Sequence, residues 1–143
     1  MTILIHATTL QLGAHGVMLL GDSGSGKSDL ALRLIAEGAL LVSDDQTLIT
    51  ISDGRLIASA PKTIAGRIEA RHLGILPAPQ IESAVVRLAA KLTGGPIERM
   101  PETAVWAPPG VTSPPHIPLI ALSPFEPSAA VKLTMALIAV AQL

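Results

Sequence analysis

Eight consecutive residues near the start of the chain combine the side chains and backbone freedom that bind nucleotide phosphates. The stretch reads Gly21-Asp22-Ser23-Gly24-Ser25-Gly26-Lys27-Ser28 and fits the P-loop pattern G-x-x-x-x-G-K-[ST]. Its glycines let backbone N–H groups approach an anion, Lys27 brings a positive charge to the β- and γ-phosphates, and Ser28 offers a hydroxyl to Mg²⁺. We therefore predict that all eight residues bind ATP and that Ser28 is a ligand of Mg²⁺.

The flanking sequence supports a strand–loop–helix unit around this motif. The apolar run Val17–Leu20 is typical of a buried strand, and Asp29–Glu37 repeats apolar residues at helical spacing before Gly38 ends the pattern. A loop between a strand and a helix N-terminus presents free amide groups to a phosphate. The alternative is a glycine- and serine-rich turn that contains Lys-Ser by chance, and the agreement of motif and context disfavours it.

Asp44 and Asp45 are the second set of residues that could do chemistry. They follow the apolar stretch Ala39–Val42, which is typical of a strand after the P-loop helix. A carboxylate at a strand end beside a P-loop can hold Mg²⁺ or accept the proton of an attacking hydroxyl. Because side chains alternate along a strand, we expect the two carboxylates to point in different directions and to have different roles. The alternative is a solvated turn before the β-hairpin predicted over 47–59.

Four further residues are candidates for the same site, although each alone suits an ordinary structural role. His6 ends a predicted first strand that we expect beside the P-loop strand. Glu69 and Arg71 alternate with apolar residues, as on the charged face of a sheet. Arg99 lies in a segment rich in proline and glycine, 93–118, where surface charges are common.

Composition limits the class of protein. The chain of 143 residues is long enough for one domain with a hydrophobic core, and we predict a single domain over 1–143. Apolar residues make up 49% and charged residues 15%, and the net charge of −1 gives no electrostatic basis for binding nucleic acid or an anionic membrane. Cysteine is absent, which excludes disulfides and thiolate metal sites and fits a cytoplasmic protein.

The ends of the chain predict neither a signal peptide nor a membrane span. The N-terminal stretch lacks a basic flank and a long apolar core. The longest apolar stretch, Ala129–Leu143, is shorter than a membrane span and contains Lys132. We predict a last helix over Ser128–Leu143 whose apolar residues point in all directions. Such a helix indicates either a homo-oligomer, which we favour, or a fully buried position.

The order of the predicted elements favours an α/β domain. A strand, the P-loop helix and a following strand form a βαβ order, which predicts a mostly parallel central sheet with an added β-hairpin. The stretch Ile81–Leu92 is ambiguous, because its valines favour a strand and its Leu-Ala-Ala-Lys-Leu end would suit a helix. A late strand is predicted over Ile117–Leu122, where Pro118 indicates a sheet edge or a late start because it lacks an amide proton.

Taken together, these residues resemble the P-loop kinase domain of the HPr kinase/phosphorylase family over roughly the first half of the chain. That family has a histidine well upstream of the P-loop and an Asp-Asp pair after the next strand, where this chain has His6 and Asp44-Asp45. It also has a signature close to G-R-x-E-x-R-G-x-G-I. Gly66–Ile75 departs from this signature only at His72. The chain begins directly at the kinase domain, which resembles the short alphaproteobacterial form.

The resemblance implies an ATP-dependent protein serine kinase that phosphorylates an HPr-type phosphocarrier protein of the phosphotransferase system. In that role Lys27 and the loop amides would bind ATP, and Ser28 with Glu69 would hold Mg²⁺. Asp45, preferred over Asp44, would accept the proton of the substrate serine. Most of the rate would come from positioning and from charge neutralisation by Lys27 and Mg²⁺.

The same resemblance implies two further roles and leaves one activity open. Asp44 and His6 would position or tune the proton acceptor, and Arg99 would be the catalytic arginine. The family's arginine-rich late stretch, which is linked with phosphorolysis of the phosphorylated carrier, has no clear copy, since Ser123–Pro127 contains no arginine. The phosphorylase reaction therefore stays open. The family's hexamer is one form that the predicted homo-oligomer would take.

Two other functions are open on the sequence. A P-loop kinase of a small molecule often carries an arginine-rich lid, and the segment 93–118 contains only Arg99. A non-catalytic ATP-sensing module would bind ATP without transferring its phosphate. The specificity of the combined motifs favours the protein kinase over both.

Overall fold

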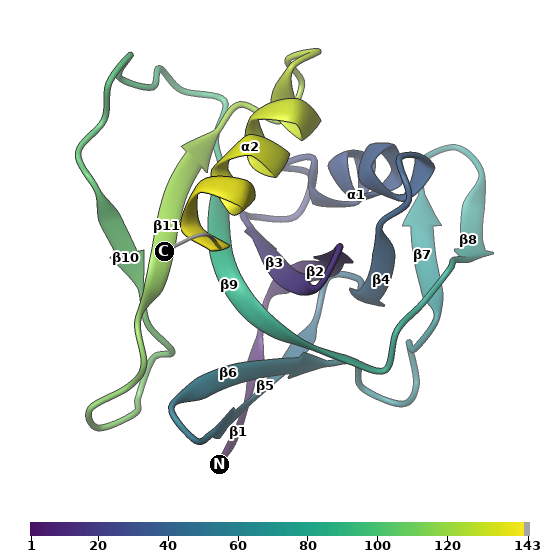
Figure 1. Ribbon diagram of the computed structural model, residues 1–143. Coiled ribbons are helices and arrows are strands. Elements are labelled where there is room, and N and C mark those ends of the chain that lie inside the picture. The colour runs from purple at the N-terminus through teal and green to yellow at the C-terminus, as the bar shows by residue number, and fades with distance from the viewer. Residues whose placement is uncertain (142–143) are drawn as a thin grey trace.

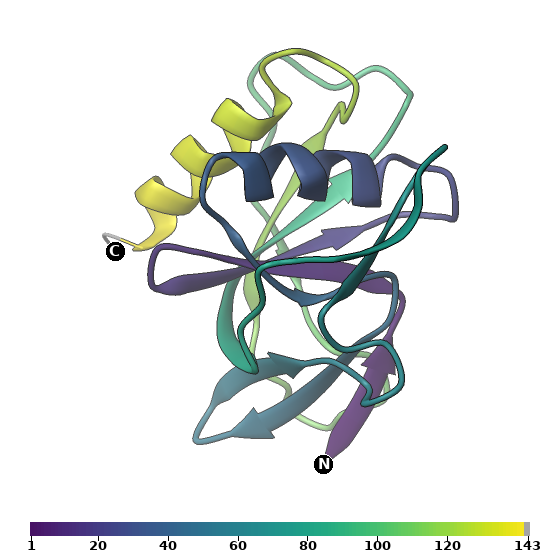
Figure 2. The ribbon, with the colours of Figure 1, turned by 90° about the vertical axis from the view of Figure 1, so that its right-hand side faces the viewer.

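Two helices cover one face of a curled β-sheet in the computed structural model, which describes residues 1–141 (Figure 1). Helix α1 spans Lys27–Ala36 and helix α2 spans Ala129–Ala141. The first strand and the hairpin over 47–59 belong to the same sheet and form the part that curls away from the helices (Figure 2). Helix α1 lies over β2 (Ala7–Leu12) and β4 (Leu40–Ser43) at one end of the sheet, whereas α2 lies over its central strands.

Nine strands form the sheet, and two more form a separate hairpin. Seven of the nine follow the spatial order β1-β5-β6-β9-β3-β2-β4, and β11 and β10 continue from β9. The bounds in chain order are β1 Thr2–Ile5, β2 Ala7–Leu12, β3 His15–Leu20, β4 Leu40–Ser43, β5 Thr47–Ser52, β6 Arg55–Ser59, β7 Arg67–Ala70, β8 Gly74–Pro77, β9 Ser83–Leu92, β10 Ala104–Trp106 and β11 Ile117–Leu122. The separate hairpin consists of β7 and β8.

The α/β class is confirmed, but the sheet is mixed and not mostly parallel. Among the described strands only β3 with β9 and β9 with β11 pair in parallel, and the other pairs are antiparallel. The reason lies in the connections. Two-residue turns, Gly13-Ala14 and Asp53-Gly54, join β2 to β3 and β5 to β6, and so short a turn allows only antiparallel pairing. The predicted hairpin over 47–59 is β5–β6 and is confirmed.

The ambiguous stretch forms a strand, β9, through the centre of the sheet. Leu88 and Ala90 are fully buried in the core beneath the helices, and Ala89 is fully buried in a second core on the opposite face. A strand covered on both faces carries a continuous apolar run, so it lacks the two-residue period that distinguishes a strand from a helix. The predicted late strand is β11, and its pairing with β9 begins at Leu119, directly after Pro118.

The predicted last helix is confirmed over Ala129–Ala141, and the last two positions of that prediction lie outside the described residues. Leu133 and Leu137 of α2 join Leu30 and Leu34 of α1 in the core over the sheet. Within residues 1–141 no helix is long and apolar enough to cross a membrane.

Candidate active site

The P-loop joins the carboxyl end of β3 to the N-terminus of α1, as the motif predicts. Gly26 is the N-cap of α1 and has a φ of 101°, a conformation that favours glycine. At Gly21 an added Cβ would lie 2.4 Å from Oγ of Ser25, so the loop closes on itself too tightly for a side chain at that position. The first amide groups of a helix have no partner within it, and this end of α1 is therefore suited to an anion.

Lys27 directs its charge into the loop. Its side chain is buried, and Nζ donates hydrogen bonds to the backbone oxygens of Gly21 at 2.6 Å and Asp22 at 3.0 Å. An ammonium group has three protons, so one remains for a phosphate oxygen. The two bonds hold the charge inside the curve of the loop, where the phosphates of a nucleotide would lie.

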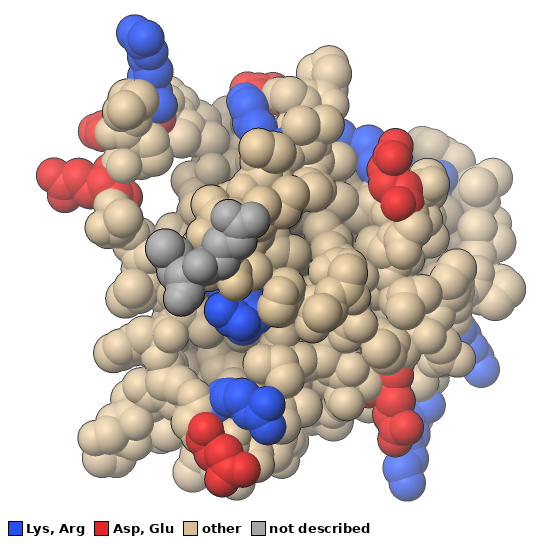
Figure 3. Space-filling model, viewed as in Figure 1, with Lys and Arg blue, Asp and Glu red and all other residues tan. Residues whose placement is uncertain are grey.

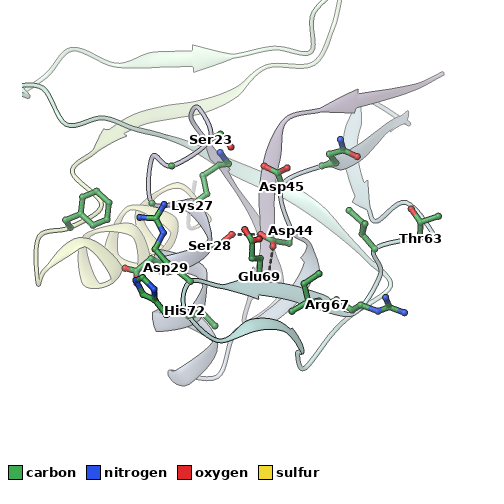
Figure 4. Close-up of a pocket in the computed structure, with 18 residues that line it drawn as sticks. Ser23, Lys27, Ser28, Asp29, Asp44, Asp45, Thr63, Arg67, Glu69 and His72 are labelled. Atoms are coloured by element: carbon green, nitrogen blue, oxygen red, sulfur yellow. Dashed lines mark hydrogen bonds between the residues drawn. The ribbon is translucent and has the colours of Figure 1, made fainter.

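Asp44 is the buried centre of a hydrogen-bond network that links four elements (Figure 4). Oδ1 accepts from Oγ of Ser28 at 2.7 Å and from Oγ1 of Thr8 at 3.1 Å, and Oδ2 accepts from the backbone amide of Glu69 at 2.9 Å. The donors come from the P-loop helix, from β2 and from β7. Asp44 is thus held in one orientation beside the P-loop serine.

Asp45 is placed differently from Asp44, as expected, but strand alternation is not the reason, because β4 ends at Ser43. Its side chain is about half exposed, and Oδ1 lies 2.6 Å from Nε2 of His6, in the bend between β1 and β2. Asp45 has a φ of 65°, in the left-handed region that aspartate tolerates better than most residues. Its amide donates to Oγ1 of Thr8 at 3.0 Å, so β2 holds the backbone of Asp45 and the side chain of Asp44.

The strand β7 brings a charged face to the same place. Arg67 and Glu69 are exposed while Ile68 and Ala70 are buried, so the period of two expected for a sheet face is confirmed. The exposed side lines the pocket in front of the P-loop, together with Arg71 just beyond the strand (Figure 4). The charged face and the candidate site are therefore the same surface.

The pocket has the size and charge that a metal-bound nucleotide needs. Its volume is about 690 Å³, within the usual range of ligand sites. Its walls carry three cations and four carboxylates, namely Lys27, Arg67, Arg71, Asp29, Asp44, Asp45 and Glu69. A polyphosphate alone would add strongly to the negative charge, and a divalent cation bound with it would reduce that addition.

The donor set in this pocket fits Mg²⁺. The Ser28 hydroxyl, the Asp44 carboxylate and the Glu69 side chain all line it, and Mg²⁺ prefers oxygen ligands. Within the described residues no three His, Cys, Asp or Glu side chains are close enough to hold a metal by themselves. Mg²⁺ commonly keeps waters and substrate phosphates as its remaining ligands, so this partial set suits a metal that arrives with a nucleotide.

The structure brings most of the predicted site residues together and leaves one apart. Arg99 is exposed in the segment between β9 and β10 and is not among the residues that line the pocket. Residues that the sequence did not single out also contribute, among them Thr8, Arg67 and Phe125. Arg67 belongs to the quoted signature and could have been included on that ground. Thr8 and Phe125 carry no signal in the sequence.

Comparisons with known proteins agree with this geometry. The family described as the HPr serine kinase C-terminal domain matches residues 1–87. A protein named HPr kinase/phosphorylase from Clostridium botulinum (strain Eklund 17B) is 40% identical over 77 residues, which are 54% of this chain and 25% of that protein. One of the same name from Thermoanaerobacter sp. (strain X514) is 47% identical over 75 residues, 52% of this chain and 25% of that one. The chain thus spans about a quarter of the length of these curated relatives.

A solved structure supports the fold over nearly the whole chain. The HPr(Ser) kinase/phosphatase from Coxiella burnetii superimposes with a TM-score of 0.78 at 25% identity, over 98% of this chain and 90% of that one. The structural match extends past residue 87, where the match to the family model ends. The family model matches more than half of the chain, and the P-loop, the aspartate pair and the β7 signature line one pocket. The chain therefore belongs to the HPr serine kinase C-terminal domain family.

Proposed function

We propose that the chain is an ATP-dependent serine kinase that transfers a phosphoryl group to a serine of an HPr-type phosphocarrier protein. One observation carries this proposal: the P-loop serine is hydrogen-bonded to buried Asp44, and the next residue, Asp45, presents a half-exposed carboxylate in the same pocket. The relatives that match these motifs are named HPr kinase/phosphorylase. We assign the reaction to the cytoplasm, where ATP and a carrier of the phosphotransferase system meet.

The phosphate-binding half of the site consists of the P-loop and Lys27. The loop amides at the N-terminus of α1 bind the β- and γ-phosphates, and Lys27 offsets the charge that develops as the terminal phosphoryl group leaves. Because Lys27 already donates to two loop carbonyls, it is oriented before the nucleotide binds. A preorganised charge contributes more to the rate than one that must first be moved into place.

Ser28 and Glu69 are the proposed protein ligands of Mg²⁺. When bound, Mg²⁺ would offset the negative charge of the nucleotide phosphates. Asp44 supports this site from behind, since its Oδ1 accepts the Ser28 hydroxyl and its Oδ2 accepts the Glu69 amide. One buried carboxylate therefore positions both proposed ligands.

Asp45 is the proposed proton acceptor. As the substrate hydroxyl oxygen forms its bond to the γ-phosphorus, the bond from phosphorus to the β–γ bridging oxygen breaks, and the hydroxyl proton passes to Asp45. His6 occupies Oδ1 of this carboxylate, and Oδ2 has no hydrogen-bond partner among the described residues. His6 is therefore a positioning residue that fixes the carboxylate and leaves one oxygen for the hydroxyl.

The test is phosphoryl transfer from γ-labelled ATP to HPr-type carriers of the same organism. We expect label on a serine of the carrier, and no label when Lys27→Ala replaces the wild-type chain. Label on a metabolite and not on a carrier would indicate a small-molecule kinase. ATP binding with no transfer to any carrier or metabolite would indicate a sensing module.

Phosphorolysis of the phosphorylated carrier is a separate question about the same pocket. The segment Ser123–Pro127 supplies no arginine, although its Phe125 lines the pocket. Incubation of the serine-phosphorylated carrier with inorganic phosphate tests it directly. Release of pyrophosphate would extend the proposed function to a phosphorylase.

We further propose that the chain forms a homo-oligomer through α2, the family's hexamer being one such form. Leu133 and Leu137 point into the core, while Val131, Met135 and Ile138 are 46–63% exposed on the outer face. Few charged side chains lie over this helix (Figure 3). We expect assembly at micromolar concentration in sedimentation experiments, weakened by Met135→Lys. A monomer at that concentration would reject the assembly.

A further inference from the structure

Phe125 is an exposed aromatic side chain at the candidate active site. It is the only phenylalanine of the chain, and 68% of it is exposed. It lines the same pocket as Lys27, Ser28 and Asp44. A phenylalanine side chain stabilises a protein most when it is buried. A ring that is exposed in a ligand pocket is therefore a candidate contact for the ligand.

The fold puts Phe125 beside the phosphate-binding loop. The three strands β3, β9 and β11 run parallel, so their carboxyl ends meet at one edge of the sheet. In open α/β sheets this edge is where ligands bind. The P-loop follows β3, and the loop that carries Phe125 follows β11 and reaches the N-terminus of α1 (Figure 2). A Cβ added to Gly26 would lie 3.0 Å from Cζ of Phe125, so the ring packs directly on the P-loop.

The loop around Phe125 is fastened to the P-loop helix on both sides of the ring. Arg33 of α1 donates from Nη2 to the backbone oxygen of Pro124, and from Nη1 to that of Glu126 at 3.3 Å. The Arg33 guanidinium also lies 3.3 Å from Asp29 of the same helix, and Glu126 pairs with Lys132 of α2 at 2.7 Å. The backbone on both sides of Phe125 is therefore held relative to the phosphate-binding amides, which is the support that a binding platform needs.

We propose that Phe125 is the stacking platform for the adenine ring of ATP. The proposal rests on the proposed function only in assuming that ATP occupies the P-loop. An aromatic face attracts a base through stacking, and such a contact contributes about a fivefold to hundredfold change in affinity per base. With the phosphates at Lys27 and the base on Phe125, the pocket would hold the nucleotide at both ends.

Stacking makes a prediction that packing of the P-loop does not. If the ring stacks on the base, removing the ring weakens the binding of ATP and leaves the binding of an inorganic polyphosphate unchanged. If the ring only supports the loop through its contact with Gly26, the affinities for both ligands fall together. Calorimetric titration with Mg·ATP and with Mg·tripolyphosphate separates these cases.

The variants are Phe125→Ala, Phe125→Trp and Val105→Ala. Val105 is a matched control, because it is an exposed apolar residue on β10 outside the pocket lining. We expect Phe125→Ala to lower the affinity for ATP by at least about fivefold and to leave the affinity for tripolyphosphate unchanged. Phe125→Trp should retain the affinity for ATP, and Val105→Ala should bind both ligands as the wild-type chain does. Thermal unfolding by circular dichroism verifies that each variant is folded.

Two results would overturn the stacking role. Equal ATP affinity in Phe125→Ala and the wild-type chain would show that the ring does not touch the base. An equal loss for ATP and tripolyphosphate would assign the ring to the P-loop instead. Failure of the folded wild-type chain to bind ATP would overturn the proposed function itself, a result that is distinct from both.

Discussion

Thr8 donates a hydrogen bond from its fully buried hydroxyl to Oδ1 of Asp44, over 3.1 Å. The same hydroxyl accepts the backbone amide of Asp45 at 3.0 Å. A single oxygen on β2 thus sets the position of both aspartates with respect to each other and to the P-loop. A shift of Asp44 would break a buried hydrogen bond and a shift of Asp45 a partly buried one, and such losses are costly where water cannot replace the bond.

The first prediction concerns this threonine. Thr8→Val keeps the shape of the side chain but removes the hydroxyl, which leaves one lone pair of Asp44 and the Asp45 amide without their partner. We expect the free energy of unfolding to fall by about 1–3 kcal/mol. Phosphoryl transfer should fall by about tenfold to a hundredfold, because a small displacement of catalytic groups is enough for such a loss. Urea titration and initial rates at saturating ATP measure the two effects.

Thr9→Val is the matched control for Thr8→Val. Thr9 is also fully buried on β2, but its hydroxyl pairs with that of Thr47 at 2.9 Å and touches neither aspartate. We expect a comparable loss of stability with a nearly unchanged rate. A rate loss in Thr9→Val as large as that in Thr8→Val would mean that general destabilisation, and not the aspartates, explains both.

The second prediction compares two arginines. Arg71 lines the pocket, while Arg99 is exposed on the segment before β10 and does not line it. We expect Arg71→Ala to lower transfer by about a hundredfold if its guanidinium stabilises the transferring phosphoryl group. Arg99→Ala should change the rate little within a single chain. The measurement is kcat for both variants with the carrier protein as substrate.

The opposite ranking would restore Arg99 as the catalytic arginine suggested by the resemblance. In that case the segment 93–118 would have to approach the pocket during the reaction, or Arg99 would have to act on the pocket of another copy. Mixing Arg99→Ala chains with Lys27→Ala chains distinguishes these two cases, since recovered activity would require residues from two copies.

The third prediction concerns Lys27. We expect Lys27→Ala to abolish transfer and to lower the affinity for ATP. The fold should be retained, because among the described residues Nζ bonds only to two carbonyls of its own loop. Loss of one preorganised charge of this kind commonly lowers the rate by a hundredfold or more. Circular dichroism and a transfer assay on one sample check both parts. Normal transfer would rule out this pocket as the site.

The local parts of the site could be predicted from the sequence because a short motif determines them. The P-loop amides, Lys27 and the strand and helix around them lie within about twenty consecutive residues, so spacing alone places them. The different surroundings of the two aspartates are also predicted, but for the wrong reason, because β4 ends at Ser43 and Asp45 has a left-handed backbone that strand alternation does not describe. These predictions need no knowledge of how distant segments meet.

The rest depends on contacts between segments far apart in the chain. Thr8 is an ordinary strand residue until β4 and β7 bring Asp44 and Glu69 beside it, and Phe125 reaches Gly26 only because β11 lies next to β9. The prediction of a mostly parallel sheet is wrong for a related reason. The βαβ order suggested parallel pairing, but the two-residue turn after β2 makes β2 and β3 antiparallel neighbours.

The last prediction separates the two aspartates. Asp45→Asn keeps the size of the side chain but removes the proton acceptor, so transfer should fall by about a hundredfold or more while ATP binding is retained. Asp44→Asn should act differently, because the buried carboxylate accepts three hydrogen bonds and supports the proposed Mg²⁺ ligands Ser28 and Glu69. An asparagine NH₂ group cannot accept, so that variant should lose stability and bind Mg²⁺ more weakly.

The measurement is the initial rate of both variants across a range of Mg²⁺ concentrations. Added Mg²⁺ should restore part of the rate of Asp44→Asn, because more metal compensates for a weaker site by mass action. It should not restore Asp45→Asn, because no concentration of metal supplies the missing base. His6→Ala provides a further comparison, since it leaves Asp45 ionisable but removes its partner at 2.6 Å, and its loss should be smaller than that of Asp45→Asn. Identical Mg²⁺ profiles for the two aspartate variants would contradict the division of roles, and a greater unrescued loss in Asp44→Asn would reverse it.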